Sequence, residues 1–198
     1  MREFPLIKAA HALQDLTTEE VATTALELGL IDAAEMPGLW REIGPHDASL
    51  EHFGSACVRR ELLTGFQWER LRNGYRNGFF YGRTKVLYQA GAGSFARVYR
   101  AIAQDNQEIL AVKVLRKRFS ADEIKGELFL REGRMGLMLR HPGIVRMDEE
   151  GKEGVRSIIT MEFVEGKTRR ELGKMRKGRE LTGALELAGQ LIDDVVDD

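Results

Sequence analysis

The chain has 198 residues, of which 43% are hydrophobic and 31% charged, with a formal net charge of −1. This composition is ordinary for a soluble globular protein of one domain or two small ones. The near-neutral charge excludes the broad basic field that nucleic-acid-binding proteins use. The single cysteine, Cys57, excludes an intrachain disulfide and is expected to pack in a helix core.

No apolar run in the sequence is long enough for a signal peptide or a membrane span. We therefore expect a cytoplasmic protein without a membrane segment in these residues. Anchoring through a part of the protein beyond them stays open.

Residues 1–80 are predicted to form a helical leader. Thr17 is followed three residues later by Glu20, and Thr64 by Gln67, which is the spacing of a capping box at the start of a helix. Proline and glycine residues between these boxes divide the region into short helices. No pattern in it is specific enough to assign a function, so we interpret it as a scaffold or protein-interaction segment; the alternative is a second enzymatic site.

After residue 80 the pattern predicts an α+β fold. Ser120 to Glu123 forms a third capping box, which predicts a long helix reaching about Leu139. A charged turn around Gly151 and Gly154 is expected to join the last two strands. Short connections favour an antiparallel arrangement, so we expect a five-stranded sheet with this helix on one face. The predicted strands are residues 86–88, 98–102, 109–115, 144–147 and 157–161.

Two glycines, Gly91 and Gly93, lie between the first two of these strands. A dinucleotide-binding turn would open a helix here, but Val98 and its neighbours continue as a strand. The pattern therefore favours a loop that covers phosphates between two antiparallel strands. Ala96 stands where such loops usually have a third glycine, and alanine does not easily take a positive φ, so we expect a stiffer loop.

Lys113 shares a strand face with Ala111 because side chains alternate along a strand. A small residue beside a lysine suits a flat ring next to a cation that reaches phosphate oxygens. The alternative is a solvent-exposed lysine on an edge strand.

The helix after Ser120 carries large apolar residues at three- and four-residue spacing, which predicts a buried stripe. Glu132 falls at the edge of this stripe on the helical wheel, and a carboxylate facing a core needs a cation. We therefore predict an ion pair between Glu132 and Lys113; the alternative is a glutamate that reaches to water. The stripe residues are Ile124, Leu128, Met135 and Leu139.

Five motifs follow one another in register. They are Gly-x-Gly-x-x-x-x-Val at 91–98, Ala-Val-Lys at 111–113, Phe-Leu-Arg-Glu at 129–132, Leu-Arg-His-Pro-Gly-Ile-Val at 139–145 and Ile-Thr-Met-Glu-Phe-Val-Glu-Gly at 159–166. In order and spacing they resemble the N-terminal, ATP-binding lobe of protein kinases. The resemblance covers about residues 80–198 and is greatest to bacterial serine/threonine kinases of the eukaryotic type.

At the phosphate end, the resemblance implies that Gly91 and Gly93 let the backbone approach the triphosphate of ATP. Lys113 would bind the α- and β-phosphates, and Glu132 would hold Lys113 in place. These two residues are the predicted catalytic pair.

At the adenine end, the resemblance implies that Val98 and Ala111 lie over the ring. Met161 takes the gatekeeper position, where a long side chain narrows the back of the pocket. The carbonyl of Glu162 and the amide of Val164 would hydrogen-bond the adenine edge.

The family's His-Arg-Asp, Asp-Phe-Gly and Ala-Pro-Glu motifs are absent from these 198 residues. We therefore interpret the chain as a leader (1–80), an N-terminal lobe (81–166) and the start of an incomplete C-terminal lobe (167–198). The parent enzyme would transfer the γ-phosphoryl of MgATP to protein serine or threonine. This chain has no residues placed to bind the metal, and we expect it to be inactive alone.

The alternative function is that of a pseudokinase or half-kinase that binds other proteins. In either case residues 181–198 carry an apolar helical pattern that a C-terminal lobe would normally cover, so we expect a homo-oligomer formed through them. The alternative is that this segment folds back onto the helical leader. The basic run at 167–179 is interpreted as a solvated helix face, without a role in nucleic-acid binding.

Overall fold

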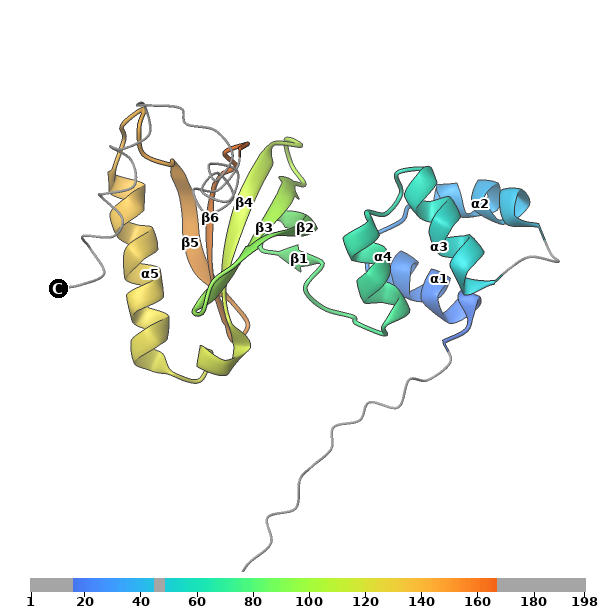
Figure 1. Cartoon of the computed structure of the whole chain (residues 1–198), viewed down its shortest axis with the longest axis horizontal. Helices are drawn as coiled ribbons and strands as arrows, with labels where there is room; N and C mark the ends of the chain where they lie inside the picture. The colour runs from blue at the N-terminus through green and yellow to red at the C-terminus, as the bar shows by residue number, and fades with distance from the viewer. Residues whose placement is uncertain (1–15, 45–48, 167–198) are drawn as a thin grey trace, which may run out of the picture. The chain divides into compact units, whose positions relative to one another are not determined.

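The computed structural model describes residues 16–44 and 49–166 of the chain. The chain divides into two compact units, residues 1–89 and 90–198 (Figure 1). Each unit has a hydrophobic core of its own.

The first unit is helical up to its last strands, as the sequence predicts. The capping boxes at Thr17 and Thr64 are both confirmed, each with its two reciprocal hydrogen bonds. The elements are α1 (Thr18–Glu27), the 3-10 turn η1 (Ala33–Glu35), α2 (Met36–Ile43), α3 (Leu50–Arg59), α4 (Gly65–Arg72), β1 (Phe80–Tyr81) and the first part of β2 (Thr84–Ala92).

Aromatic side chains build the core of the helical leader. The ring centroid of Phe53 lies 5.5 Å from that of Trp40 and 6.3 Å from that of Trp68. Gly54 leaves the space for the Trp68 ring, because a Cβ at this position would lie 2.0 Å from it. Cys57 is buried in this core, as predicted, and burial raises the pKa of its thiol to about 12.

The leader also binds the first half of β2. The Gln67 side chain, 1% exposed, donates from Nε2 to the carbonyl of Val86 at 2.6 Å. The Thr64 hydroxyl donates to the carbonyl of Leu87 at 2.5 Å, and Lys85 Nζ donates to the carbonyl of Leu30 at 2.9 Å. Burial lowers the pKa of Lys85. The leader and the start of β2 are therefore parts of one folded unit.

Up to residue 166, the second unit is an antiparallel sheet with the α-helix α5 on it, which confirms the predicted α+β fold. Its strands lie in the order β3-β4-β6-β5, and α5 packs on β5 and β6 (Figure 1). With β2 they are the five predicted strands, but the described sheet has six, because the short strand β1, which was not predicted, pairs with β2. The elements are β3 (Ala96–Ala103), β4 (Ile109–Leu115), η2 (Lys117–Phe119), α5 (Glu123–Met138), β5 (Met147–Glu153) and β6 (Arg156–Glu162).

Two predicted boundaries are wrong. Asp122, not Ser120, caps α5, because its Oδ1 accepts the Lys125 amide at 3.0 Å. Strand β5 starts at Met147 instead of Ile144 and runs through the charged residues that were expected to form a turn. β5 is the outermost strand beside β6, where charged side chains can reach water.

The predicted buried stripe of α5 is also wrong. Ile124 is 75% exposed and Leu128 55%, and Met135 and Leu139 are exposed as well. The face toward the sheet is made instead by two large apolar residues and three glycines: Phe129, Leu130, Gly126, Gly133 and Gly136. Glycines bring the helix close to the sheet without adding to an apolar pattern, so the periodicity of large residues identified the opposite face.

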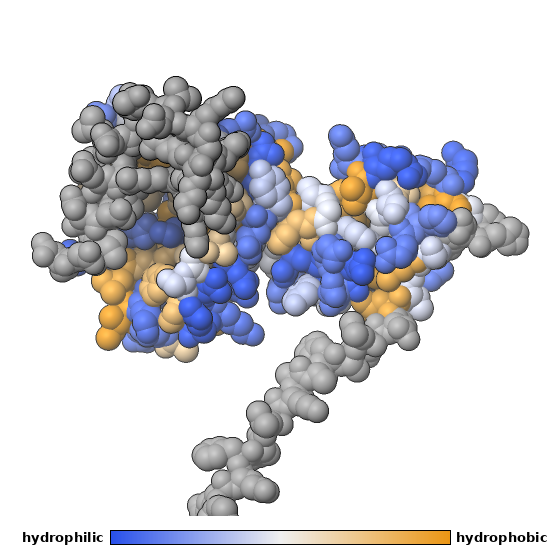
Figure 2. Space-filling model, in the orientation of Figure 1, coloured by the Kyte–Doolittle hydropathy of each residue, from blue (hydrophilic) through white to orange (hydrophobic). Residues whose placement is uncertain are grey.

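Apolar surface (orange) is visible in Figure 2 on the side of the second unit where α5 lies. Between residues 16 and 166, none of the described helices has the length and apolar character needed to cross a membrane.

Candidate functional site

The strand register places four of the predicted site residues on one face of the sheet. Val98 lies directly opposite Lys113, and Ala111 directly opposite Met161. Opposite residues of antiparallel strands project to the same side, and so do Ala111 and Lys113, two positions apart. Lys113 is also opposite Ile159, which packs with Phe129 of α5. The shared face is therefore the one that α5 partly covers.

Lys113 and Glu132 form the ion pair that the sequence predicts. The Nζ atom lies 2.5 Å from Glu132 Oε1 and 5.6 Å from the centroid of the Phe129 ring. The side chains are 25% and 49% exposed, so the pair contributes at most about 1 kcal/mol to stability. Its effect is on geometry: it fixes a cation at a defined position on the sheet. The reason given for the pair was wrong, since Glu132 borders an exposed apolar face.

The glycine loop runs from the end of β2 to the start of β3. Its turn is closed by a hydrogen bond from the Gly93 amide to the Ala96 carbonyl at 3.0 Å. Two arginines after β4 hold its tip: Arg116 Nε donates to the Gly93 carbonyl at 2.9 Å, and the Arg118 guanidinium donates to the Ser94 carbonyl. Sequence reasoning missed both arginines. The sequence signal that could have indicated them is the basic run at residues 116–118, which directly follows β4, the strand of Lys113.

Ala96 fits this loop without backbone strain. Gly91, Gly93 and Ala96 all lack a positive φ in this conformation, so alanine meets no conformational penalty at the third position. The side chain of Ala96 is buried, and its register partner is Leu115. Whether the loop is stiffer than one with three glycines stays a prediction.

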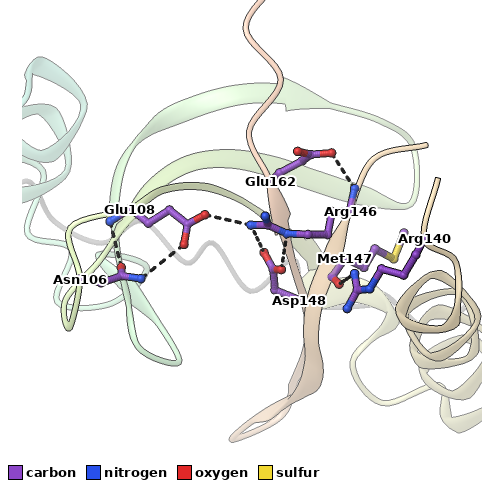
Figure 3. Close-up of polar contacts among 7 residues, drawn as sticks. All are labelled: Asn106, Glu108, Arg140, Arg146, Met147, Asp148 and Glu162. Atoms are coloured by element: carbon purple, nitrogen blue, oxygen red, sulfur yellow. Dashed lines mark hydrogen bonds and ion pairs between the residues drawn. The ribbon is translucent and has the colours of Figure 1, made fainter. Parts of the chain in front are cut away.

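At the other end of the sheet, Glu162 is the last residue of β6 and Val164 lies two residues beyond it, 64% exposed. The Glu162 carboxylate accepts a hydrogen bond from the Arg146 amide at 2.7 Å, and the Glu162 amide donates to the Arg146 carbonyl at 2.9 Å (Figure 3). Sequence reasoning missed Arg146, which follows the family motif and looks like a surface residue.

The residues present fit a nucleoside triphosphate. A fixed cation suits phosphate oxygens. The side chain of Ala111, only 6% exposed, projects little from the sheet and so leaves room beside Lys113. Over residues 16–44 and 49–166, no three His, Cys, Asp or Glu side chains gather as a metal site.

A hollow of about 570 Å³ lies in the leader and includes none of the predicted site residues. It is lined by Ala22, Leu26, Met36 and Trp40 with Glu19.

Comparisons with known proteins agree with this geometry. The family model of the protein kinase domain matches residues 84–192, more than half of the chain. Serine/threonine-protein kinase pkn2 of Myxococcus xanthus is 34% identical over 110 residues, 54% of this chain and 13% of that protein. Serine/threonine-protein kinase PrkC of Bacillus subtilis is 37% identical over 92 residues, 46% of this chain and 14% of that protein. The chain thus spans a small part of the length of these relatives.

Among solved structures, the kinase domain of PknI from Mycobacterium tuberculosis superposes with a TM-score of 0.46 at 24% identity. The match covers 53% of this chain and 42% of that chain. The predicted terminal helix and the oligomer expected through it, at 181–198, lie outside the described residues.

Proposed function

Because this chain belongs to the protein kinase family, we propose that residues 81–166, which include strands β2 to β6 and helix α5, are the ATP-binding lobe of a bacterial serine/threonine protein kinase. The observation that carries the proposal is the Lys113–Glu132 ion pair beside the glycine loop. In this proposal residues 1–80 are a leader, 81–166 the lobe and 167–198 the start of a second lobe.

Lys113 binds the α- and β-phosphates, and Glu132 holds its ammonium in place. Gly91 and Gly93 let the loop backbone come near the phosphates, and Arg116 holds the loop through its bond to the Gly93 carbonyl.

At the adenine end, Val98 and Ala111 lie over the ring and Met161 bounds its back. The Glu162 carbonyl and the Val164 amide pair with its edge. Bound MgATP supplies the phosphoryl group that the parent enzyme transfers to a protein hydroxyl.

We further propose that these 198 residues do not transfer phosphate alone, since they contain no His-Arg-Asp or Asp-Phe-Gly motif. Incubation of the purified chain with labelled ATP and a protein substrate is expected to give no more product than Lys113→Met. Product above that level would contradict the proposal.

Nucleotide binding tests the site itself. Calorimetric titration is expected to show weak binding of MgATP, because one lobe supplies only part of the contact surface of a kinase pocket. Lys113→Met and Glu132→Gln should weaken it further, while Lys152→Met, an exposed lysine of β5, should not. Equal affinity in all four proteins would exclude the assigned site.

The second candidate function is a protein-interaction module. It is favoured by the exposed apolar face of α5, where Ile124 is 75% and Met138 76% exposed. If this function is correct, the chain binds a protein partner equally well with Lys113→Met, whereas Ile124→Asp abolishes binding.

A further inference from the structure

A network of charged residues surrounds Arg146, just before β5. The Arg146 guanidinium donates from Nε to Asp148 Oδ1 at 2.7 Å and from a terminal nitrogen to Glu108 Oε1 at 2.9 Å. Glu108 belongs to the turn between β3 and β4, where its amide donates to Asn106 Oδ1 at 3.0 Å. Both carboxylates raise the pKa of Arg146, so it stays charged.

The backbone of the same arginine holds Glu162. Figure 3 shows the Glu162 carboxylate directed at the Arg146 nitrogen, with the guanidinium extending the other way to Asp148 and Glu108. Together with the bond from the Glu162 amide to the Arg146 carbonyl, two hydrogen bonds fix one residue at the end of β6. Three segments distant in sequence therefore meet at Arg146: the β3–β4 turn, the residues before β5, and the end of β6.

We propose that Arg146 is a positioning residue that gives the site its selectivity for adenine. Glu162 is the residue whose carbonyl is assigned to the adenine edge, so a fixed Glu162 backbone presents that acceptor in one orientation. The Glu162 side chain is engaged with Arg146, which leaves recognition of the ring to the backbone. This inference rests on the proposed ATP site and adds the residue that orients it.

The pattern of donors and acceptors on the ring provides the test. Adenosine carries an amino donor at C6 and an acceptor at N1, which match a carbonyl followed by an amide. Inosine carries a carbonyl at C6 and a donor at N1, so it presents the reverse pattern. A rigid backbone at Glu162 and Val164 distinguishes the two nucleosides, and a mobile backbone there does so less well.

The experiment measures the affinities of the 198-residue chain for adenosine, inosine and MgATP from NMR chemical-shift titrations. Arg146→Ala keeps the backbone bonds to Glu162 but removes the guanidinium bonds to Asp148 and Glu108 that hold that backbone in place. It is expected to weaken adenosine binding by about three- to tenfold, the value of one or two partly exposed charge-assisted bonds, with a smaller effect on inosine. The ratio of the affinity for adenosine to the affinity for inosine therefore falls. Glu162→Ala should lower the ratio in the same way, whereas Glu162→Gln keeps an oxygen for the Arg146 amide and should preserve it.

Two further variants separate selectivity from folding. Arg134→Ala removes an arginine of similar exposure, 46% against 43%, from ion pairs with Glu127 of α5 and Glu150 of β5, and should leave the ratio unchanged. Asp148→Asn removes a charge partner of Arg146 at nearly constant size, so it tests the network even if Arg146→Ala unfolds the chain. A purely structural role would lower both nucleoside affinities equally.

The outcomes distinguish this inference from the proposed function. If MgATP binds, Lys113→Met weakens it, and the ratio is the same in the wild type, Arg146→Ala and Asp148→Asn, the role of Arg146 is overturned and the ATP site stands. If the wild type binds neither MgATP nor adenosine, the proposed function fails and this inference fails with it.

Discussion

Gln67 is a fully buried polar side chain whose amide nitrogen and amide oxygen both have partners. Its Nε2 donates to the Val86 carbonyl and its Oε1 accepts from the Thr64 amide, at 2.6 and 2.9 Å. One residue therefore caps α4 and binds strand β2. A buried carbonyl left without a donor costs about 1–3 kcal/mol.

We therefore expect Gln67→Ala to lower the free energy of unfolding by about 2 kcal/mol, measured by urea denaturation. Gln89→Ala provides the matched control, because Gln89 is an exposed glutamine of β2, the strand that Gln67 binds. Equal denaturation midpoints for the two variants would show that the Gln67 bonds contribute nothing to stability.

Cys57 lies in the leader core, where burial keeps its thiol protonated. We expect it to react with an aromatic disulfide reagent at pH 8 only after denaturation, since the thiolate is the reactive form. Rapid labelling of the native chain would contradict this.

The same pKa shift predicts a dependence of stability on pH. Between about pH 9 and 12 the folded thiol retains a proton that the unfolded chain loses, so its contribution is constant below pH 9 and decreases as the pH rises. The stability difference between wild type and Cys57→Ala should therefore shrink between pH 8 and pH 10.

At the scale of one element, α5 approaches its sheet through glycines. A Cβ on Gly136 would lie 2.1 Å from Met147 Sδ, and one on Gly133 would lie 2.8 Å from the Glu150 Cβ. At Gly126 the nearest atom outside the helix, Ser157 Oγ, is at an ordinary 3.8 Å. The three positions share one helix but differ in the space above them.

Glycine to alanine stabilises an open helix position by about 0.5–1 kcal/mol, and Gly126→Ala should do so. Gly136→Ala and Gly133→Ala should instead destabilise by about 1–3 kcal/mol through overpacking. Adding Met147→Ala to Gly136→Ala should recover part of the loss, as a double-mutant cycle from urea denaturation would show. Stabilisation by all three alanines would refute the close packing.

These elements also show what the sequence could predict. The boxes at Thr17 and Thr64 and the β4 strand depend on neighbouring residues alone, and they are confirmed. The buried face of α5 was wrong because glycines determine it through contacts with β5 and β6, which no apolar periodicity records.

At the site, the Lys113–Glu132 pair was predicted correctly but from a buried stripe that is in fact exposed. What made the partner identifiable was the opposite charge of a lysine on a strand and a glutamate on the helix that packs on the same sheet. Arg116 and Arg146 could not be predicted, since each bonds a group more than 15 residues away in the sequence, the Gly93 carbonyl for Arg116 and the Glu162 carboxylate for Arg146. Such contacts depend on how strands pair, which the residue pattern does not record.

At the scale of the whole molecule, the leader and the first part of strand β2 fold as one unit, which ends at Gln89. Removing residues 1–78 would leave the Val86 and Leu87 carbonyls without their partners from α4 and expose Phe79, which is 1% exposed in the complete chain. Unpaired strand groups and apolar surface promote aggregation.

We expect residues 79–198 alone to aggregate or to unfold at lower urea concentration than the full chain, measured by light scattering and circular dichroism. Adding residues 1–78 as a separate polypeptide should restore solubility. A soluble residue 79–198 chain with an unchanged midpoint would show that the lobe folds without its leader.

The hydrogen bonds from α4 to β2 also have an evolutionary consequence. The family match begins at Thr84, but Val86 and Leu87, just inside it, have partners in α4, outside it. A recombination event that joined a new N-terminal sequence at residue 84 would inherit a strand without the partners of those two carbonyls. A segment that is exchanged between genes without this loss must therefore begin before α4. The boundary of the family match, at residue 84, underestimates the length of that segment.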